Sequence, residues 1–192
     1  MKLNLPNKLT LLRVILIPIF IIFFLLSKNN NQIYIKALNI DIYRLISAII
    51  FVIASITDYF DGKIARERNL ITDFGKLLDP LADKLLVITA MLLLTETKEI
   101  HYLCTLIVVL RELTISSIRL VALEKGIVIA ASIWGKLKTS TQMISIVLIL
   151  FKIYSINSYF LLITYTIFYI STVFVILSLI DYIVKSKEVF LN

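Results

Sequence analysis

Long apolar stretches are the feature that most restricts how this chain of 192 residues can fold. A helix needs ~20 mostly apolar residues to cross the hydrocarbon core of a bilayer. Hydrophobic residues make up 59% of the chain and charged residues only 17%. These charged residues are too few to cover so much apolar surface if the chain folded in water. The sequence therefore predicts an all-α integral membrane protein with six transmembrane helices in one bundle, at roughly residues 10–27, 44–63, 80–97, 102–122, 138–156 and 159–184.

The sequence shows no sign of a second domain. It contains no internal repeat, low-complexity tract or linker, so we predict one membrane domain over residues 1–192. Pro6 is typical of an early helical position, and we expect a short interfacial segment before the first span. The apolar run at residues 14–26 is not followed by a small-residue cleavage site, which predicts a retained helix. A single cysteine, Cys104, excludes an internal disulfide.

The basic residues predict the orientation in the membrane. Six spans place both termini on one side, where fourteen Lys and Arg residues fall, against five on the other side. Cytoplasmic loops collect Lys and Arg, so we predict cytoplasmic N- and C-termini in the cell (inner) membrane. This bias accounts for most of the net charge of +7, and no nucleic-acid partner is expected.

Four aspartates lie where the second and third spans meet the predicted cytoplasmic side. Asp58 and Asp61 are three residues apart, and Asp79 and Asp83 are four apart, so each pair shares one helix face. The short connection makes the two helices antiparallel neighbours, which would bring the four carboxylates together. Ionisable groups in membrane segments are costly and usually functional. Two divalent cations would neutralise them, and oxygen-only ligands favour Mg²⁺ or Mn²⁺ over zinc.

Helix capping is the alternative explanation of each pair taken alone. Asp79 before Pro80 resembles an N-cap followed by proline at the first helical position, and Asp61-Gly62 could end a helix. Because capping accounts for at most two of the four carboxylates, we favour a shared metal site. The stretch "DYFDG" lacks the alternating ligands of an EF-hand. A pair of metal ions beside basic residues suits an in-line displacement at phosphorus.

The order D-x2-D-G-x2-A-R-x8-G-x3-D-x3-D is met at every position by Asp58, Asp61, Gly62, Ala65, Arg66, Gly75, Asp79 and Asp83. This order resembles the signature of the CDP-alcohol phosphotransferase (CDP-alcohol phosphatidyltransferase) family. The resemblance implies six transmembrane helices, a homodimer and an active site that opens to the cytoplasm. It also implies that the four aspartates bind two divalent metal ions and that Asp83 is the general base. The implied binding site for the cytidine diphosphate comprises Asp61, Gly62, Ala65, Arg66 and Gly75.

Basic residues in the fourth and fifth spans bear on the acceptor alcohol. Arg111 and Arg119 lie in the fourth span with Glu112, and Lys136 and Lys138 open the fifth. Cationic groups beside hydrocarbon need an anionic partner. Either Glu112 satisfies one of them as an internal ion pair, or they bind an acceptor that carries its own phosphate. Choline, ethanolamine and inositol carry no phosphate.

The segments "PNKLTLLR", "LREL", "SSIRL" and "GKLKT" are also similar to the phosphatidylglycerophosphate synthase branch of that family. The branch transfers a phosphatidyl group from CDP-diacylglycerol to the primary hydroxyl of glycerol 3-phosphate. By this resemblance, the acceptor's phosphate binds to Arg111, Arg119, Lys136 and Lys138.

Two alternatives stay open. One is another CDP-diacylglycerol-dependent phosphatidyltransferase, making cardiolipin, phosphatidylserine or phosphatidylinositol phosphate. The more remote one is a divalent-cation transporter, although transporters often show paired repeats, which this sequence lacks.

Overall fold

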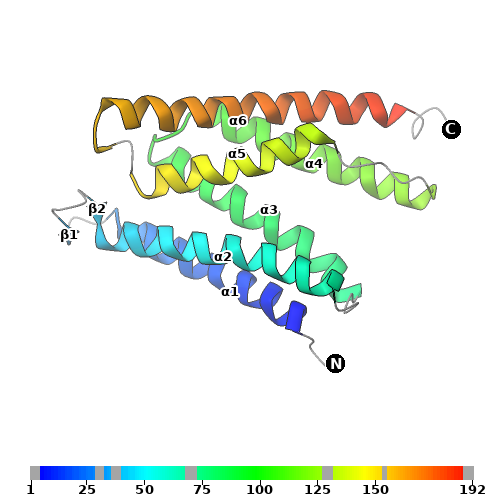
Figure 1. Cartoon of the computed structure of the whole chain (residues 1–192), viewed down its shortest axis with the longest axis horizontal. Helices are drawn as coiled ribbons and strands as arrows, with labels where there is room; N and C mark the ends of the chain where they lie inside the picture. The colour runs from blue at the N-terminus through cyan, green and yellow to red at the C-terminus, as the bar shows by residue number, and fades with distance from the viewer. Residues whose placement is uncertain are drawn as a thin grey trace.

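Helices make up nearly all of the described part of the chain (Figure 1). The computed structural model describes residues 5–28, 33–35, 40–67, 73–126, 132–152 and 155–187, with side chains except at 5, 6, 58–67, 73–77, 79 and 80. The elements in chain order are α1 (Leu5–Leu26), β1 (Tyr34–Ile35), β2 (Ile40–Asp41), α2 (Ile42–Glu67), α3 (Asp73–Glu96), α4 (Tyr102–Glu124), α5 (Ile133–Leu150) and α6 (Ser158–Lys185).

Successive helices run in opposite directions along one bundle (Figure 1). We call the end where α1 begins and α6 ends the terminal end, and the other, which carries the antiparallel β1–β2 pair, the hairpin end. The helix α1 packs along α2, and α5 packs along α6. Helix α3 contacts α1, α2, α4 and α5, so it joins the two pairs. The main hydrophobic core includes Phe20, Phe51, Leu86, Met91 and Ile146.

Apolar surface on the helices indicates a membrane protein. The helices α1 and α6 are long and apolar enough to cross a membrane, over Asn7–Leu26 and Ser158–Lys185, and α2 has a shorter apolar stretch, Ile42–Thr57. Large side chains such as Leu113 and Leu162 are exposed along α4 and α6. Exposed apolar area of this extent marks contact with lipid or with another protein.

Each of the six predicted spans coincides with one helix, but several boundaries differ. Helix α5 begins at Ile133, five residues before the predicted start, because its first turns carry lysines that lower the hydropathy. Helix α1 begins at Leu5, so the predicted interfacial segment around Pro6 is the first turn of the helix itself.

The two capping interpretations of the aspartates are wrong. Helix α2 continues to Glu67, so Asp61-Gly62 does not end it, and α3 begins at Asp73, so Asp79 is not its N-cap. Both helices extend beyond their apolar stretches at the terminal end, where hydropathy no longer marks helical backbone. The aspartate backbone therefore lies within regular helix on both sides of the α2–α3 connection.

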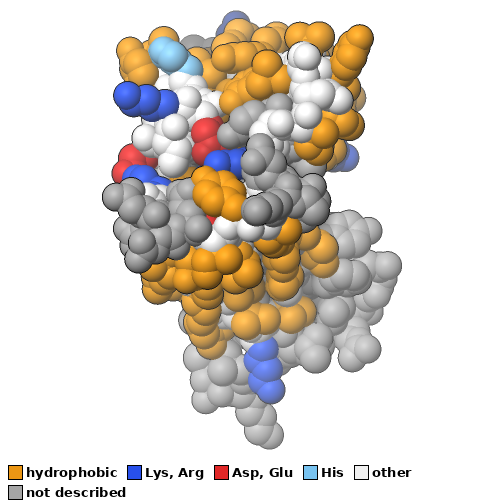
Figure 2. Space-filling view, turned by 90° about the vertical axis from the view of Figure 1, so that its left-hand side faces the viewer, with side chains coloured by type: hydrophobic (Ala, Val, Ile, Leu, Met, Phe, Trp, Pro, Cys, Tyr) orange, Lys and Arg blue, Asp and Glu red, His pale blue; other side chains and the backbone are white. Residues whose placement is uncertain are grey.

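A buried ionic cluster lies at the hairpin end. Figure 2 shows this end of the molecule, where a few charged side chains lie among hydrophobic ones. Arg44 of α2 pairs with Glu99 at 2.8 Å and donates from Nε to the carbonyl oxygen of Leu150 at 3.2 Å. Its guanidinium carbon lies 4.2 Å from the centroid of the Phe24 ring. Leu150 is the last residue of α5, and its carbonyl lacks a partner within the helix. Arg44 therefore connects α1, α2, α5 and the α3–α4 turn.

Candidate active site

Five of the residues predicted to form the site line one cavity of about 810 Å³. Asp83 comes from α3, Arg111 and Arg119 from α4, and Lys136 and Lys138 from α5. The cavity lies toward the terminal end, because α3 and α5 begin there and α4 ends there (Figure 1). The fold thus brings a predicted catalytic carboxylate and all four predicted acceptor-binding cations to the same cavity.

Helical spacing directs the basic side chains into the cavity. Arg111 and Arg119 are eight residues apart, slightly more than two turns of α4, so both lie on nearly the same face. On α5, Lys138 and Gln142 are buried one turn apart and both line the cavity. This arrangement follows the i, i+4 periodicity that places side chains on one helix face.

Glu112 forms the centre of a buried ionic cluster on the cavity wall. Its Oε1 lies 2.7 Å from Nη1 of Arg111 and 2.5 Å from Nζ of Lys138. The three side chains are only 8–11% exposed. Arg111 also donates from Nη2 to Oγ of Ser178 on α6 at 2.7 Å. The internal ion pair considered from the sequence is present, and it engages two cations instead of one.

Arg119 and Lys136 have different surroundings. Arg119 donates from Nε to the hydroxyl oxygen of Tyr182 at 3.1 Å, and its guanidinium carbon lies 5.6 Å from that ring's centroid. The side chain of Lys136 is exposed. Within the described part of the chain, neither Arg119 nor Lys136 forms an ion pair. The four cations therefore divide into two with a carboxylate partner and two without one among these residues.

Sequence reasoning missed the contribution of α6 to the cavity. It assigned no role to the tyrosines of the last span, yet Tyr182 lines the cavity and is 2% exposed. Ser178 and Tyr182 are one helical turn apart, and each accepts a hydrogen bond from an arginine of α4. The available signal was a pair of polar side chains at i, i+4 within an apolar helix.

The remaining predicted site residues lie outside the described side chains. Among the four predicted metal ligands, Asp83 is the one with a described side chain, and it is half-buried. The described side chains include no group of three His, Cys, Asp or Glu residues that could hold a metal ion. Helix α2 packs against α3, and the predicted donors on them are all carboxylates, a set that fits Mg²⁺ or Mn²⁺. Described only as helical backbone are Asp58, Asp61, Gly62, Ala65, Arg66, Gly75 and Asp79.

The described side chains give the cavity an excess of positive charge. Lys84 joins the four predicted cations in its lining, whereas its carboxylates are Asp83 and Glu112. Lys84 is held by a hydrogen bond to Oγ of Ser116 on α4. A cavity wall that is lined by one sign of charge concentrates ligands of the opposite sign, so the part of the cavity formed by these described side chains favours an anion.

Comparison with known proteins identifies the family. Residues 3–182 match the family model of CDP-alcohol phosphatidyltransferase, a range that includes all residues of the cavity. The "CDP-diacylglycerol--glycerol-3-phosphate 3-phosphatidyltransferase" of Bacillus subtilis (strain 168) is 43% identical over 143 residues, which cover 74% of each chain.

Two further relatives with the same name match over nearly their whole length. The protein of Wigglesworthia glossinidia brevipalpis is 36% identical over 198 residues, covering 100% of both chains. That of Haemophilus influenzae is 35% identical over 191 residues, covering 97% of this chain and 95% of the relative. The chain therefore belongs to the CDP-alcohol phosphatidyltransferase family, as its aspartate motif predicted.

Proposed function

We propose that this protein transfers a phosphatidyl group from CDP-diacylglycerol to the primary hydroxyl of glycerol 3-phosphate. The products are phosphatidylglycerophosphate and CMP. The relatives that match over their full length carry the name of this activity. The structural observation that supports it most is the cavity in which Asp83 lies with cations from two further helices.

The acceptor's two functional groups correspond to the two kinds of side chain in the cavity. Glycerol 3-phosphate carries a primary hydroxyl at one end and a phosphate at the other. Arg119 and Lys136, which have no carboxylate partner among the described residues, bind the phosphate. Arg111 and Lys138 are neutralised in part by Glu112, and they supply the remaining positive charge of the wall.

Asp83 acts on the acceptor's hydroxyl. Its carboxylate accepts the proton as the hydroxyl oxygen attacks the β-phosphorus of CDP-diacylglycerol. The bond between that phosphorus and the bridging oxygen breaks, and CMP leaves with the bridging oxygen. The cytidine diphosphate is bound by the motif residues Asp61, Gly62, Ala65, Arg66 and Gly75.

Two divalent cations, Mg²⁺ or Mn²⁺, complete the proposed site. The residues that would hold them are Asp58, Asp61, Asp79 and Asp83. When bound, such ions neutralise the charge that develops on the attacking and leaving oxygens of a phosphoryl displacement.

The proposed location is the cell (inner) membrane, with six spans in a single domain and the terminal end facing the cytoplasm. Helix α1 begins and helix α6 ends at the terminal end (Figure 1), and the cavity lies toward the same end. A lipid donor and a water-soluble acceptor can meet at such an interface. A homodimer, which the family resemblance implies, is part of the proposal.

The first test measures CMP release by the purified protein in detergent micelles. We expect release from CDP-diacylglycerol only when both a divalent cation and glycerol 3-phosphate are present. Asp83→Asn should lower the rate by roughly 10²- to 10⁴-fold, the usual contribution of a general base. The matched control is Glu96→Gln, since Glu96 is a half-exposed carboxylate at the hairpin end.

Two outcomes would contradict the proposal. In an acceptor screen, faster CMP release with phosphatidylglycerol, serine or inositol phosphate than with glycerol 3-phosphate would reject the acceptor. If the wild-type protein released no CMP but carried a divalent-cation flux into proteoliposomes that Asp83→Asn abolished, the protein would be a transporter and not a phosphatidyltransferase.

A further inference from the structure

We infer that Tyr182 is a positioning residue: it holds Arg119 by Nε and leaves the two terminal nitrogens of the guanidinium for the ligand. The inference rests on the proposed function for the identity of that ligand, the phosphate of glycerol 3-phosphate. It adds a residue of α6 to a site that the sequence placed on α2 to α5.

The ring of Tyr182 is fixed by packing between two helices. It is 2% exposed and packs in a small hydrophobic cluster with Ile115 and Ile118 of α4. Leu179, one turn earlier in α6, packs against the same cluster. Because a buried ring in a close-packed cluster keeps its orientation, its hydroxyl oxygen is a fixed acceptor at the cavity wall.

This acceptor engages one of the five N–H donors of Arg119. The hydrogen bond from Nε to Oη of Tyr182 is 3.1 Å long. Among the described residues, the terminal nitrogens Nη1 and Nη2 of Arg119 make no hydrogen bond. A guanidinium binds phosphate best through two parallel N–H donors, an arrangement that these two nitrogens can supply.

Arg111 provides the contrast within the same helix. Its Nη1 donates to Glu112 and its Nη2 donates to Ser178, so each terminal nitrogen already has one N–H engaged within the protein. The two arginines of α4 therefore line one cavity but use different nitrogens within the protein. Arg111 donates from its terminal nitrogens, whereas Arg119 donates from Nε. The bond to Tyr182 distinguishes Arg119 as the arginine that is prepared for an external anion, with the exposed Lys136 in the same cavity.

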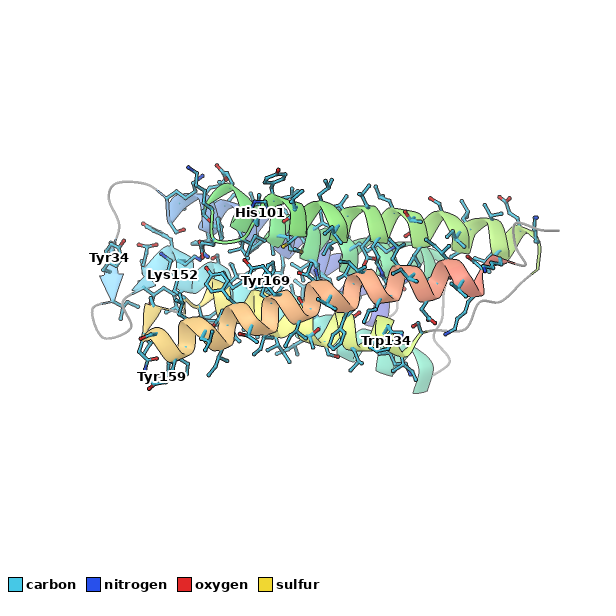
Figure 3. The ribbon with its side chains drawn as sticks, turned by 90° about the horizontal axis from the view of Figure 1, so that it is seen from above. Tyr34, His101, Trp134, Lys152, Tyr159 and Tyr169 are labelled. Carbon is cyan, nitrogen blue, oxygen red and sulfur yellow. The ribbon has the colours of Figure 1, made fainter. Side chains whose placement is uncertain are left out.

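The direct test is Tyr182→Phe, which keeps the buried ring and removes the hydroxyl acceptor. We expect the KM for glycerol 3-phosphate to rise about tenfold, the effect of losing one hydrogen bond to a charged group. The kcat and the KM for CDP-diacylglycerol should stay unchanged. The matched control is Tyr169→Phe, because Tyr169 lies on the same helix toward the hairpin end (Figure 3) and should leave all three constants unchanged.

A double-mutant cycle separates positioning of Arg119 from a general effect on packing. Arg119→Ala should raise the same KM by more than Tyr182→Phe does. Adding Tyr182→Phe to Arg119→Ala should then change nothing further, since the residue to be positioned is gone. If the two effects multiply instead, Tyr182 acts independently of Arg119 and the inference is rejected.

Arg119→Lys tests the inference without altering Tyr182, in case Tyr182→Phe does not fold. Lysine keeps the charge but has no Nε donor beside two terminal donors. We expect its KM for glycerol 3-phosphate to rise at least as much as that of Tyr182→Phe. A wild-type KM in Arg119→Lys would show that a positioned guanidinium is not needed.

Failure of the proposed function is recognised in the wild-type protein, by the absence of CMP release with glycerol 3-phosphate. The inference is then decided by titrating wild type and Tyr182→Phe with inorganic phosphate and measuring heat of binding. Weaker binding to Tyr182→Phe supports the positioning of Arg119, and equal binding rejects it.

Discussion

At the residue scale, Glu112 connects two cations of the cavity wall. It is one carboxylate between two cations, at 2.7 and 2.5 Å, in side chains that are almost fully buried. Breaking a buried ionic cluster by removing one partner leaves uncompensated charge in a low-dielectric environment. The stability of the cavity wall therefore depends on Glu112, whatever ligand the cavity takes.

We predict that Glu112→Gln destabilises the protein by about 3 kcal/mol, because Arg111 and Lys138 lose their shared carboxylate. The measurement is the midpoint of thermal unfolding in detergent at a fixed heating rate. Glu124→Gln is the control, since Glu124 is an exposed residue of the same helix. Equal midpoints for the two variants would show that the cluster contributes no stability.

At the scale of the elements, Arg44 is a buried charged residue that joins several elements at the hairpin end, as Glu112 joins α4 and α5 at the cavity. It connects α2 to Glu99 in the α3–α4 turn and to the carbonyl of Leu150 at the end of α5. Nearby, Lys28 pairs with Glu96, but these side chains are 35% and 54% exposed. Solvent screens an exposed pair, whereas the Arg44 side chain is only 3% exposed.

This difference predicts unequal effects of two similar substitutions at the hairpin end. Arg44→Met should lower the stability by about 3 to 5 kcal/mol, because it leaves the Glu99 carboxylate and the Leu150 carbonyl without this donor. Lys28→Met should change the stability by less than about 1 kcal/mol. Thermal unfolding of both variants measures the difference. Similar losses of stability in the two variants would contradict the prediction that the buried ion pair contributes more than the exposed one.

At the scale of the whole molecule, the alternating helices determine which ends lie together. The start of α1 and the end of α6 share the terminal end with the cavity (Figure 1). Helix α6 has 28 residues, which correspond to about 42 Å at 1.5 Å per residue. That length exceeds the ~30 Å hydrocarbon core, so residues beyond its two ends should reach opposite aqueous phases.

Cysteine labelling in intact cells checks this topology. Cys104 is the single cysteine, and its replacement by serine gives a background for one new cysteine at a time. A membrane-impermeant maleimide should label Tyr159→Cys, at the start of α6 (Figure 3), without lysis. It should label Lys187→Cys only after lysis. The reverse pattern would invert the proposed orientation, and labelling of both in intact cells would contradict a spanning α6.

The sequence alone determined the number and approximate position of the helices, because apolar stretches of membrane-spanning length leave the backbone few alternatives. It also determined the family through the specific spacing of the aspartate motif, and the family match over residues 3–182 confirms that prediction of the family. From the sequence, the motif aspartates placed the predicted metal site on the parts of α2 and α3 at the terminal end. The basic residues placed the predicted acceptor site on α4 and α5.

Only the tertiary structure decided which groups meet. Hydropathy does not mark helical backbone outside hydrocarbon, so the extension of α2 and α3 through the aspartates could not be read from it. Nor could spacing along the chain show that Glu112 takes Arg111 and Lys138, whereas Arg119 contacts Tyr182. The contacts of Glu112 with Lys138 and of Arg119 with Tyr182 depend on how α4, α5 and α6 pack, because each contact joins side chains from two different helices. The division of four similar cations into two kinds is therefore a property of the bundle.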